Sequence, residues 1–208
     1  MPRNKKGLLF VLSAPSGAGK STLARAIVYK DARFIHPVSY TTRPSRPGEK
    51  NGRDYHFVSR EKFEEFWRQG RFWERTEAHG AFYGTPKEEL ERALSRGRYV
   101  LLAIDIKGAR ALAEAYPHDT VRIFLLPPTR NAWIARLKKR RESDMDRRIA
   151  NADMELRELP RYDYVLINDE LGRATNDFFA IVRAEELKRL KTNPKGWVAA
   201  SLSALTYG

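Results

Sequence analysis

The stretch Leu9-Phe10-Val11-Leu12-Ser13-Ala14-Pro15-Ser16-Gly17-Ala18-Gly19-Lys20-Ser21-Thr22, near the start of the chain, decides the fold. An apolar run enters a turn that contains glycine, and a helical pattern with Leu23, Ile27 and Val28 leaves it. Short apolar runs rich in Val, Ile and Leu are typical of strands buried on both faces of a sheet. The segment therefore predicts a strand, a tight turn and a helix in direct succession.

The turn has the residues needed to hold phosphate. Gly17 and Gly19 permit backbone conformations that a Cβ resists. Consecutive N–H groups can then point at phosphate oxygens, at the positive end of the following helix. Lys20 supplies a mobile charge, and the Ser21 hydroxyl can ligate Mg²⁺. The usual pattern, G-x-x-x-x-G-K-[ST], begins here with Ala14 in place of glycine. The alternative is an ordinary surface turn. The residues expected to bind a nucleoside triphosphate are Ser16, Gly17, Ala18, Gly19, Lys20, Ser21 and Thr22, with Ser21 as the metal ligand.

Similar short apolar runs, bounded by turn residues, recur along the chain and predict further buried strands. A helical pattern over Arg147–Leu159 places Ile149, Ala152, Leu156 and Leu159 on one face. Alternating strands and helices imply right-handed crossovers and a mostly parallel sheet. The expected fold class is α/β, with a three-layer core around a parallel sheet, the phosphate loop after its first strand, an inserted subdomain and a basic lid. The predicted core strands are Leu8–Leu12, Tyr99–Ile104, Val121–Leu126 and Tyr164–Ile167.

Two stretches interrupt this alternation. Residues 38–94 contain a turn-rich segment, a predicted strand at Asp54–Val58, and a predicted helix at Arg60–Gln69 with Phe63, Phe66 and Trp67 on one face. A second helix begins at Thr85, which can cap it, while Pro86 fits the first turn and Glu88 completes a capping box. Residues 136–148 hold seven Lys or Arg residues against three acidic ones. We expect a core at 1–37, 95–135 and 149–190, a subdomain at 38–94, a lid at 136–148 and a tail at 191–208.

The composition limits the class of protein. The chain has 208 residues and no cysteine, which excludes a disulfide scaffold and a thiolate metal site. No stretch approaches the roughly 20 apolar residues needed to span a bilayer, so we expect a soluble cytoplasmic protein. The net charge of +13 favours polyanionic partners, although free use of arginine explains it equally well. Without a recognised DNA- or RNA-binding motif we expect no specific nucleic-acid partner and no membrane partner. The oligomeric state stays open.

The segment after the phosphate loop suggests an acceptor. Ser39–Glu49 and Asn51–Tyr55 place two arginines and a tyrosine close together, which are suitable donors for a phosphate monoester, although a solvated basic loop is an alternative. From Leu8 to Lys188 the chain resembles the guanylate kinases. The resemblance rests on Ser-Ala-Pro-Ser-Gly-Ala-Gly-Lys-Ser, Thr-Thr-Arg-Pro-x-Arg-Pro-Gly-Glu, Asp-Tyr-x-Phe-Val, Phe-Tyr-Gly-Thr and Val-Leu-Ile-Asn-Asp.

The resemblance implies transfer of the γ-phosphoryl group of ATP to GMP or dGMP, with Mg²⁺. It implies that Glu74 accepts hydrogen bonds from guanine N1–H and the 2-amino group, which adenine lacks. Taken alone, Glu74 also fits a solvated carboxylate at a helix end, and Thr85 also fits a helix cap. The residues implied to hold the GMP phosphate are Arg43, Arg46, Tyr55 and Tyr83, and those implied to donate to guanine O6 are Ser39 and Thr85.

The resemblance also implies catalytic roles. Asp105 follows a buried strand, where a carboxylate serves Mg²⁺ through water or orients the acceptor. Relatives usually have Asp-x-Asp there, and Ala103 replaces the first Asp. The lid is also shorter than usual and has Arg141 where relatives have Gly. Asn168 and Asp169, which follow the last core strand, are expected to border the adenine, with strand-end turn chemistry as the alternative. The implied catalytic residues are Lys20, Arg43, Arg136, Arg140, Arg148 and Asp105. Of these, Arg136, Arg140 and Arg148 are implied to close over the ATP phosphates. The alternative for the lid is a plain basic helical face.

Other functions fit parts of the same pattern. Some guanylate-kinase-like domains are binding modules, but those generally lose the phosphate-loop lysine, and Gly19-Lys20-Ser21 is intact here. A kinase of the same fold that acts on another phosphorylated acceptor is a third possibility. The pairing of Arg43 and Arg46 with Glu74 favours guanine over that alternative.

Overall fold

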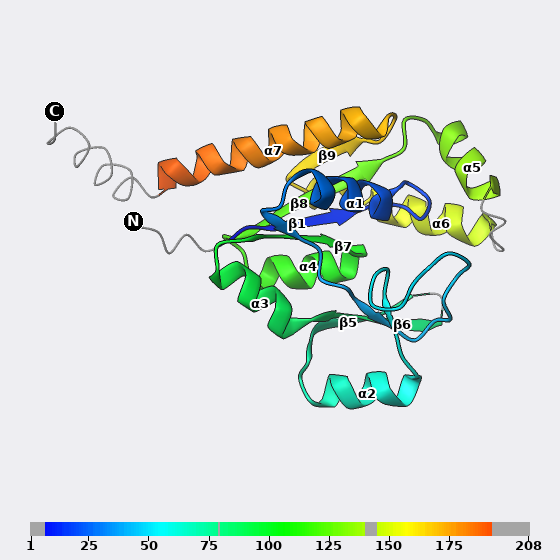
Figure 1. Cartoon of the computed structure of the whole chain (residues 1–208). Helices are drawn as coiled ribbons and strands as arrows, with labels where there is room; N and C mark the ends of the chain where they lie inside the picture. Colours follow the sequence, from blue (N-terminus) through cyan, green and yellow to red (C-terminus); the bar gives the residue numbers. More distant parts are fainter. Residues whose placement is uncertain (1–6, 79, 140–144, 193–208) are drawn as a thin grey trace, which may run out of the picture.

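The computed structural model describes residues 7–78, 80–139 and 145–192 of the chain (Figure 1). Its core is a five-stranded sheet in the order β2-β7-β1-β8-β9, and every strand pairing in it is parallel. The four predicted core strands and the parallel sheet are confirmed. The edge strand β2 has only two residues, too few to give a pattern in the sequence. The strands are β1 Leu9–Ser13, β2 Phe34–Ile35, β7 Tyr99–Ala103, β8 Thr120–Leu126 and β9 Tyr164–Ile167.

Side chains of β1 alternate between two helical layers. Phe10 and Leu12 pack with α1 and α7, while Leu9 and Val11 pack with α3 and α4. Each of these four side chains is fully buried, and burying one stabilises the fold by about 1.5–3 kcal/mol. Figure 1 shows the sheet between these layers, which makes the three-layer α/β core. The helices are α1 Lys20–Lys30, α3 Lys87–Ser95, α4 Ile106–Ala115 and α7 Leu171–Thr192.

A second, four-stranded sheet in the order β4-β3-β6-β5 forms a smaller unit on one side of the core (Figure 1). Phe63 of α2 packs against Phe72 and Phe82 beneath this sheet. Gly84 is needed here, because a Cβ at that position would lie 2.8 Å from the Phe72 ring. The elements are β3 Tyr40–Thr41, β4 His56–Phe57, α2 Arg60–Arg68, β5 Phe72–Ala78 and β6 Ala81–Pro86.

Several local predictions are wrong. Thr85 does not cap a helix, because β6 continues to Pro86, which is itself the N-cap of α3 and makes no side-chain cap hydrogen bond. No capping box with Glu88 therefore forms. The strand expected at Asp54–Val58 is only β4, since the Asp54 carboxylate accepts the Lys50 N–H and stays in the preceding turn.

The helix expected over Arg147–Leu159 is shorter. It is α6, Met145–Leu156, and a 3₁₀ turn at Leu159–Arg161 follows it. Pro160 has no backbone N–H and its ring clashes with the preceding turn of an α-helix, so an α-helix could not run through this position. Leu156 is 40% exposed instead of sharing the buried face with Ala152. The preceding helix, α5 Arg130–Lys139, already contains Arg136, so the basic stretch begins within a core-packed helix.

Candidate active site

The loop between β1 and α1 is built to approach an anion closely. Gly17 and Gly19 have φ values of 83° and 103°, in the region that residues with a Cβ avoid. A Cβ at Gly19 would also lie 2.3 Å from Asn168 Nδ2. The Ala18 N–H donates to the Pro15 carbonyl at 3.1 Å, which closes the turn. Gly19 ends the loop as the N-cap of α1, so the positive end of that helix faces the loop.

Lys20 folds back on this loop. Its Nζ donates to the Ala14 carbonyl at 3.0 Å. Desolvation lowers the pKa of the Lys20 ammonium, and the nearby negative charges of Glu155 and Asp105 oppose that decrease. Glu155 comes from α6, so a carboxylate of that helix stands near the phosphate-loop lysine. No motif in the sequence predicts a role for Glu155, because Lys20 is distant from it in the chain.

Side chains from the carboxyl end of the sheet and from α5 brace the loop. Trp133 Nε1 donates to the Ser16 carbonyl at 2.7 Å, and Asn168 Nδ2 donates to the Ala18 carbonyl at 2.7 Å. Arg136 Nη2 donates to the Asn168 carbonyl at 3.0 Å, with Nη1 3.5 Å from the Ala18 carbonyl. Of the predicted residues, Arg136 and Asn168 therefore lie against the loop.

Of the residues that brace the loop, Asn168 was predicted from the sequence and Trp133 was not. Trp133 belongs to no recognised motif, although a buried indole N–H generally needs a hydrogen-bond partner. Asn168 makes a structural contact with the loop, and its role beside adenine stays a prediction. Asp169 bonds the N–H of Glu170 and pairs with Arg173, which is the turn chemistry that the sequence left open.

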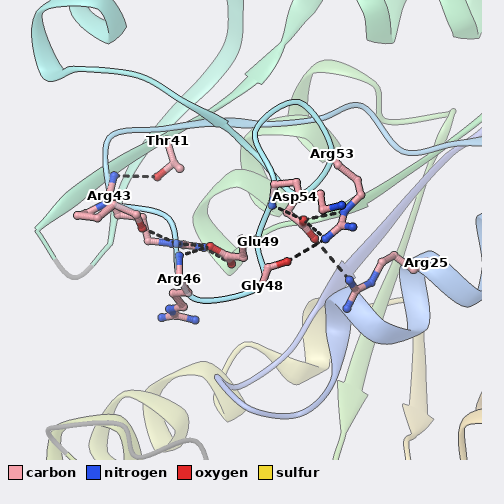
Figure 2. A network of polar contacts seen from close by, with 10 residues as sticks. Arg25, Thr41, Arg43, Arg46, Gly48, Glu49, Arg53 and Asp54 are labelled. Carbon is pink, nitrogen blue, oxygen red and sulfur yellow. Dashed lines mark hydrogen bonds and ion pairs between the residues drawn. The ribbon is translucent and has the colours of Figure 1, made fainter.

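Two of the expected phosphate donors, Arg43 and Arg46, lie on one loop together with Glu49 (Figure 2). Arg43 makes a two-pronged ion pair with Glu49, with both N–O distances 2.7 Å. The Arg46 N–H donates to Glu49 at 2.8 Å. The Arg43 guanidinium lies 5.0 Å from the centre of the Tyr55 ring, which is 5.9 Å from the Tyr83 ring. The hydrogen bonds that Arg43 donates to the Glu49 carboxylate raise the pKa of Arg43, so its charge is permanent.

Glu74 of β5 is buried and incompletely paired. Its Oε1 accepts the Thr85 hydroxyl at 2.8 Å, and its buried Oε2 has no hydrogen-bond partner among the described residues. Burial raises the pKa of Glu74 to about 7, and the charge of Asp105 adds to the increase while the Thr85 hydroxyl opposes it. Glu74 is therefore not a solvated carboxylate at a helix end. An unpaired buried oxygen is costly until a donor reaches it.

Residues expected to hold the acceptor phosphate and residues expected to read the base lie on one surface. Tyr83 and Thr85 are alternate residues of β6, so their side chains project from the same face. Thr85 contacts Glu74 and Tyr83 contacts Tyr55. Ser39 lies just before β3, where its carbonyl accepts the His56 N–H at 2.9 Å. The donation of Ser39 to a base stays a prediction.

Asp105 lies between the two halves of the site. It follows β7, which is the neighbour of β1 in the sheet, and its Oδ1 accepts the Gly108 N–H at 2.8 Å as the N-cap of α4. A Cβ on Gly108 would lie 3.4 Å from the Asp105 carboxylate and 3.5 Å from Glu74 Oε2, so the two carboxylates border the same small space. Ala103, which ends β7, brings no polar group to this edge.

The donor set suits Mg²⁺ held mainly by a nucleotide. Ser21 lies in the first turn of α1 and is exposed, so its hydroxyl is accessible. Within the described ranges, no three His, Cys, Asp or Glu residues come close enough together to form a metal cage. Mg²⁺ is commonly bound by one or two protein oxygens together with phosphate oxygens and water. The exposed Ser21 hydroxyl fits that mode.

Part of the expected lid cannot be placed. Arg140 lies outside the described residues, and so does the side chain of Arg148, although α6 contains its backbone. In the part of the chain that the structure covers, no helix combines the length and the apolar character needed to cross a membrane.

Comparison with known proteins agrees with this arrangement. The family model for guanylate kinase matches residues 6–185. A guanylate kinase of Chelativorans sp. (strain BNC1) is 46% identical over 187 residues, covering 88% of this chain and 86% of that protein. One from Onion yellows phytoplasma (strain OY-M) is 43% identical, covering 90% and 91%. The crystal structure of guanylate kinase from Anaplasma phagocytophilum superposes with a TM-score of 0.75 at 33% identity, covering 88% and 87%. The chain belongs to the guanylate kinase family.

Proposed function

We propose that this chain transfers the γ-phosphoryl group of ATP to GMP, giving ADP and GDP. The observation that carries the choice of acceptor is Glu74, a buried carboxylate with one oxygen still without a partner among the described residues. It shares a sheet face with the Tyr83 and Tyr55 rings beside Arg43. Guanine and its phosphate present the complementary groups, two N–H donors and a dianion. We place the reaction in the cytoplasm.

Glu74 would select guanine by its need for donors. The guanine N1–H and 2-amino group would satisfy the carboxylate, whereas adenine would bring no donor and leave it buried and unpaired. Thr85 can serve guanine O6 only by turning away from Glu74, because its hydroxyl carries one proton and now donates it to Oε1. Binding of GMP would therefore exchange one hydrogen bond for several.

The transfer itself needs alignment and charge neutralisation more than proton chemistry. The attacking group would be an oxygen of the GMP phosphate, which is already an anion and needs no general base. Arg43, with Tyr55 and Tyr83, would hold that phosphate, and Arg46 would approach it from the same loop. Bound Mg²⁺ would neutralise charge on the ATP phosphates. Lys20 would exchange the Ala14 carbonyl for the β- and γ-phosphates.

Closure of the phosphate site would come from α5 and α6. Arg136 already lies beside the loop, where it contacts the carbonyl groups of Ala18 and Asn168. A guanidinium there can stabilise the transferring group, as basic residues do in phosphoryl transfer. Arg140 and Arg148 remain proposed partners in this role, with Asp105 orienting the acceptor or a metal-bound water.

A panel of acceptors tests the proposal. We expect the purified chain, with ATP and Mg²⁺, to phosphorylate GMP and dGMP and to have little activity on AMP, CMP or UMP. Equal rates with AMP and GMP would refute the base-reading role of Glu74. The control is Lys20→Ala, which should abolish turnover while GMP binding stays measurable by calorimetry. Normal turnover of that variant would show that the triphosphate binds elsewhere.

A further inference from the structure

Arg25 touches both halves of the proposed site. It lies on α1, and its Nε donates to the Ser21 carbonyl in the first turn of that helix at 3.3 Å. Its Nη1 lies 3.4 Å from Asp54 Oδ1. Asp54 belongs to the loop at residues 42–55, which joins β3 to β4 and which we call the acceptor loop. One guanidinium therefore connects the start of the triphosphate-site helix with the acceptor loop.

Asp54 is also the residue that holds the acceptor loop in shape. Its Oδ2 accepts the Lys50 N–H at 2.9 Å and two nitrogens of Arg53 at 2.9 and 2.7 Å. Arg53 Nη2 donates in turn to the Gly48 carbonyl at 3.0 Å. These bonds fix the tight turn, so that moving Asp54 would move the turn with it.

The same turn carries Glu49, the residue that holds the Arg43 guanidinium. Glu49 binds the Arg43 guanidinium through both oxygens and also accepts the Arg46 N–H. Figure 2 shows Arg43 and Arg46 on one side of the loop and Arg25, which comes from α1, on the other. The series of contacts runs from Arg43 through Glu49, its neighbour Lys50, Asp54 and Arg25 to Ser21.

We propose that Arg25 and Asp54 are positioning residues that set the distance between the acceptor phosphate and the phosphate loop. This rests on the proposed function, because it assumes that GMP binds beside Arg43 and ATP beside Ser21. Neither residue is placed in contact with substrate or with a reacting atom. Phosphoryl transfer depends steeply on the alignment of the two substrates, so a link between their binding elements affects the reaction without adding a catalytic group.

The size of the effect follows from exposure. The Arg25 side chain is 62% exposed and that of Asp54 is 14% exposed, so water and salt screen the pair. Exposed ion pairs are worth less than about 1 kcal/mol, which corresponds to about a fivefold change or less. We therefore expect kcat/KM for GMP in Arg25→Ala to fall about two- to fivefold, with KM for ATP unchanged.

A double-mutant cycle with matched controls tests this. The variants are Arg25→Ala, Asp54→Asn, the two combined, and Arg25→Lys, compared by kcat/KM for GMP, KM for ATP, melting temperature and the Kd for GMP by calorimetry. Arg25→Ala should have no further effect in the Asp54→Asn background, and Arg25→Lys should recover part of the loss. Lys30→Ala removes another charge from α1, one that bonds Asn176 of α7, and should behave like the wild type.

Two outcomes would overturn the positioning role. One is a combined variant that loses the product of the two single losses. The other is an Arg25→Ala variant whose kinetics match those of Lys30→Ala. Asp54→Asn also disturbs the turn. If Asp54→Asn folds poorly, the comparison of Arg25→Ala with Lys30→Ala tests the positioning role by itself. A wild-type chain that binds GMP but does not phosphorylate it would refute the proposed function alone, since the cycle can still be completed on the Kd for GMP.

Discussion

At the scale of single residues, Glu74 combines an unfavourable environment with the base-reading role that we propose for it. Its carboxyl is buried, with a pKa of about 7 instead of 4.5. The native state therefore holds a proton that the unfolded chain releases, and the free energy of unfolding falls as pH rises from about 4.5 to about 7. Above pH 7 the full cost is present, about 3 kcal/mol for a shift of this size.

The first prediction concerns Glu74→Gln. The neutral amide has no charge to desolvate, so at pH 8 we expect this variant to melt at a higher temperature than the wild type and to lose most activity on GMP. The stability gain should shrink as pH falls toward 5, where the wild-type carboxyl is protonated. Melting curves and GMP kinetics across pH 5–8 measure both effects. A gain that is the same at every pH would show that charge burial is not the cause.

Thr85 shows how a residue that contacts a proposed site residue can lie in a wrongly predicted element. Thr85-Pro86-Lys87-Glu88 has the residues of a helix start, and local hydrogen bonding alone would favour a cap. In the structure Thr85 continues β6, because the strand pairs with β5 and the hydroxyl finds Glu74 across the sheet. Tertiary pairing outweighs a local signal of this kind, and a single sequence does not contain the pairing.

At the scale of elements, the phosphate loop depends on helix α5. The strand, loop and helix were predictable because glycine, lysine and the buried run are local and contiguous. The support from α5 was not, since Trp133 and Leu137 meet the loop across more than a hundred residues of chain. A Cβ on Gly17 would lie 2.8 Å from Leu137, so the helix packs directly on the loop.

The second prediction concerns Trp133→Phe, which keeps an aromatic ring but removes the N–H that bonds the Ser16 carbonyl. We expect the free energy of unfolding to fall by about 1 kcal/mol, the usual net value of such a bond. The KM for ATP should rise while the KM for GMP stays near the wild-type value, because the bond links α5 to the phosphate loop and not to the four-stranded sheet that carries Glu74. Trp67→Phe, on half-exposed Trp67 of α2, is the control. Equal changes in both KM values would contradict a role confined to the phosphate loop.

At the scale of the whole molecule, charge is the dominant feature. The 39 Lys and Arg residues outnumber the 26 Asp and Glu residues, for a net charge of +13. Many arginines are paired with acids on the surface, such as Arg110 with Glu158 and Arg122 with Asp163. The excess remains, and it produces a positive field that attracts anionic nucleotides and weakens with ionic strength.

The third prediction follows from that field. Raising KCl from about 20 mM to about 300 mM shortens the Debye length severalfold, so we expect the KM values for GMP and ATP to rise. Guanosine carries no phosphate, and its Kd, measured by calorimetry, should change little over the same range. If GMP and guanosine respond alike, the charge excess serves something other than nucleotide capture.

The Glu74 oxygen that has no partner among the described residues also bears on how such a chain changes over generations. Because replacing this carboxylate should stabilise the protein, mutation in a lineage with no use for guanine would tend to discard it. Stability alone gives no reason to keep it. An acidic residue at this position in a descendant would therefore indicate continuing selection for binding of the guanine nucleotide. Its loss would be an early sign that a copy of the gene has changed function.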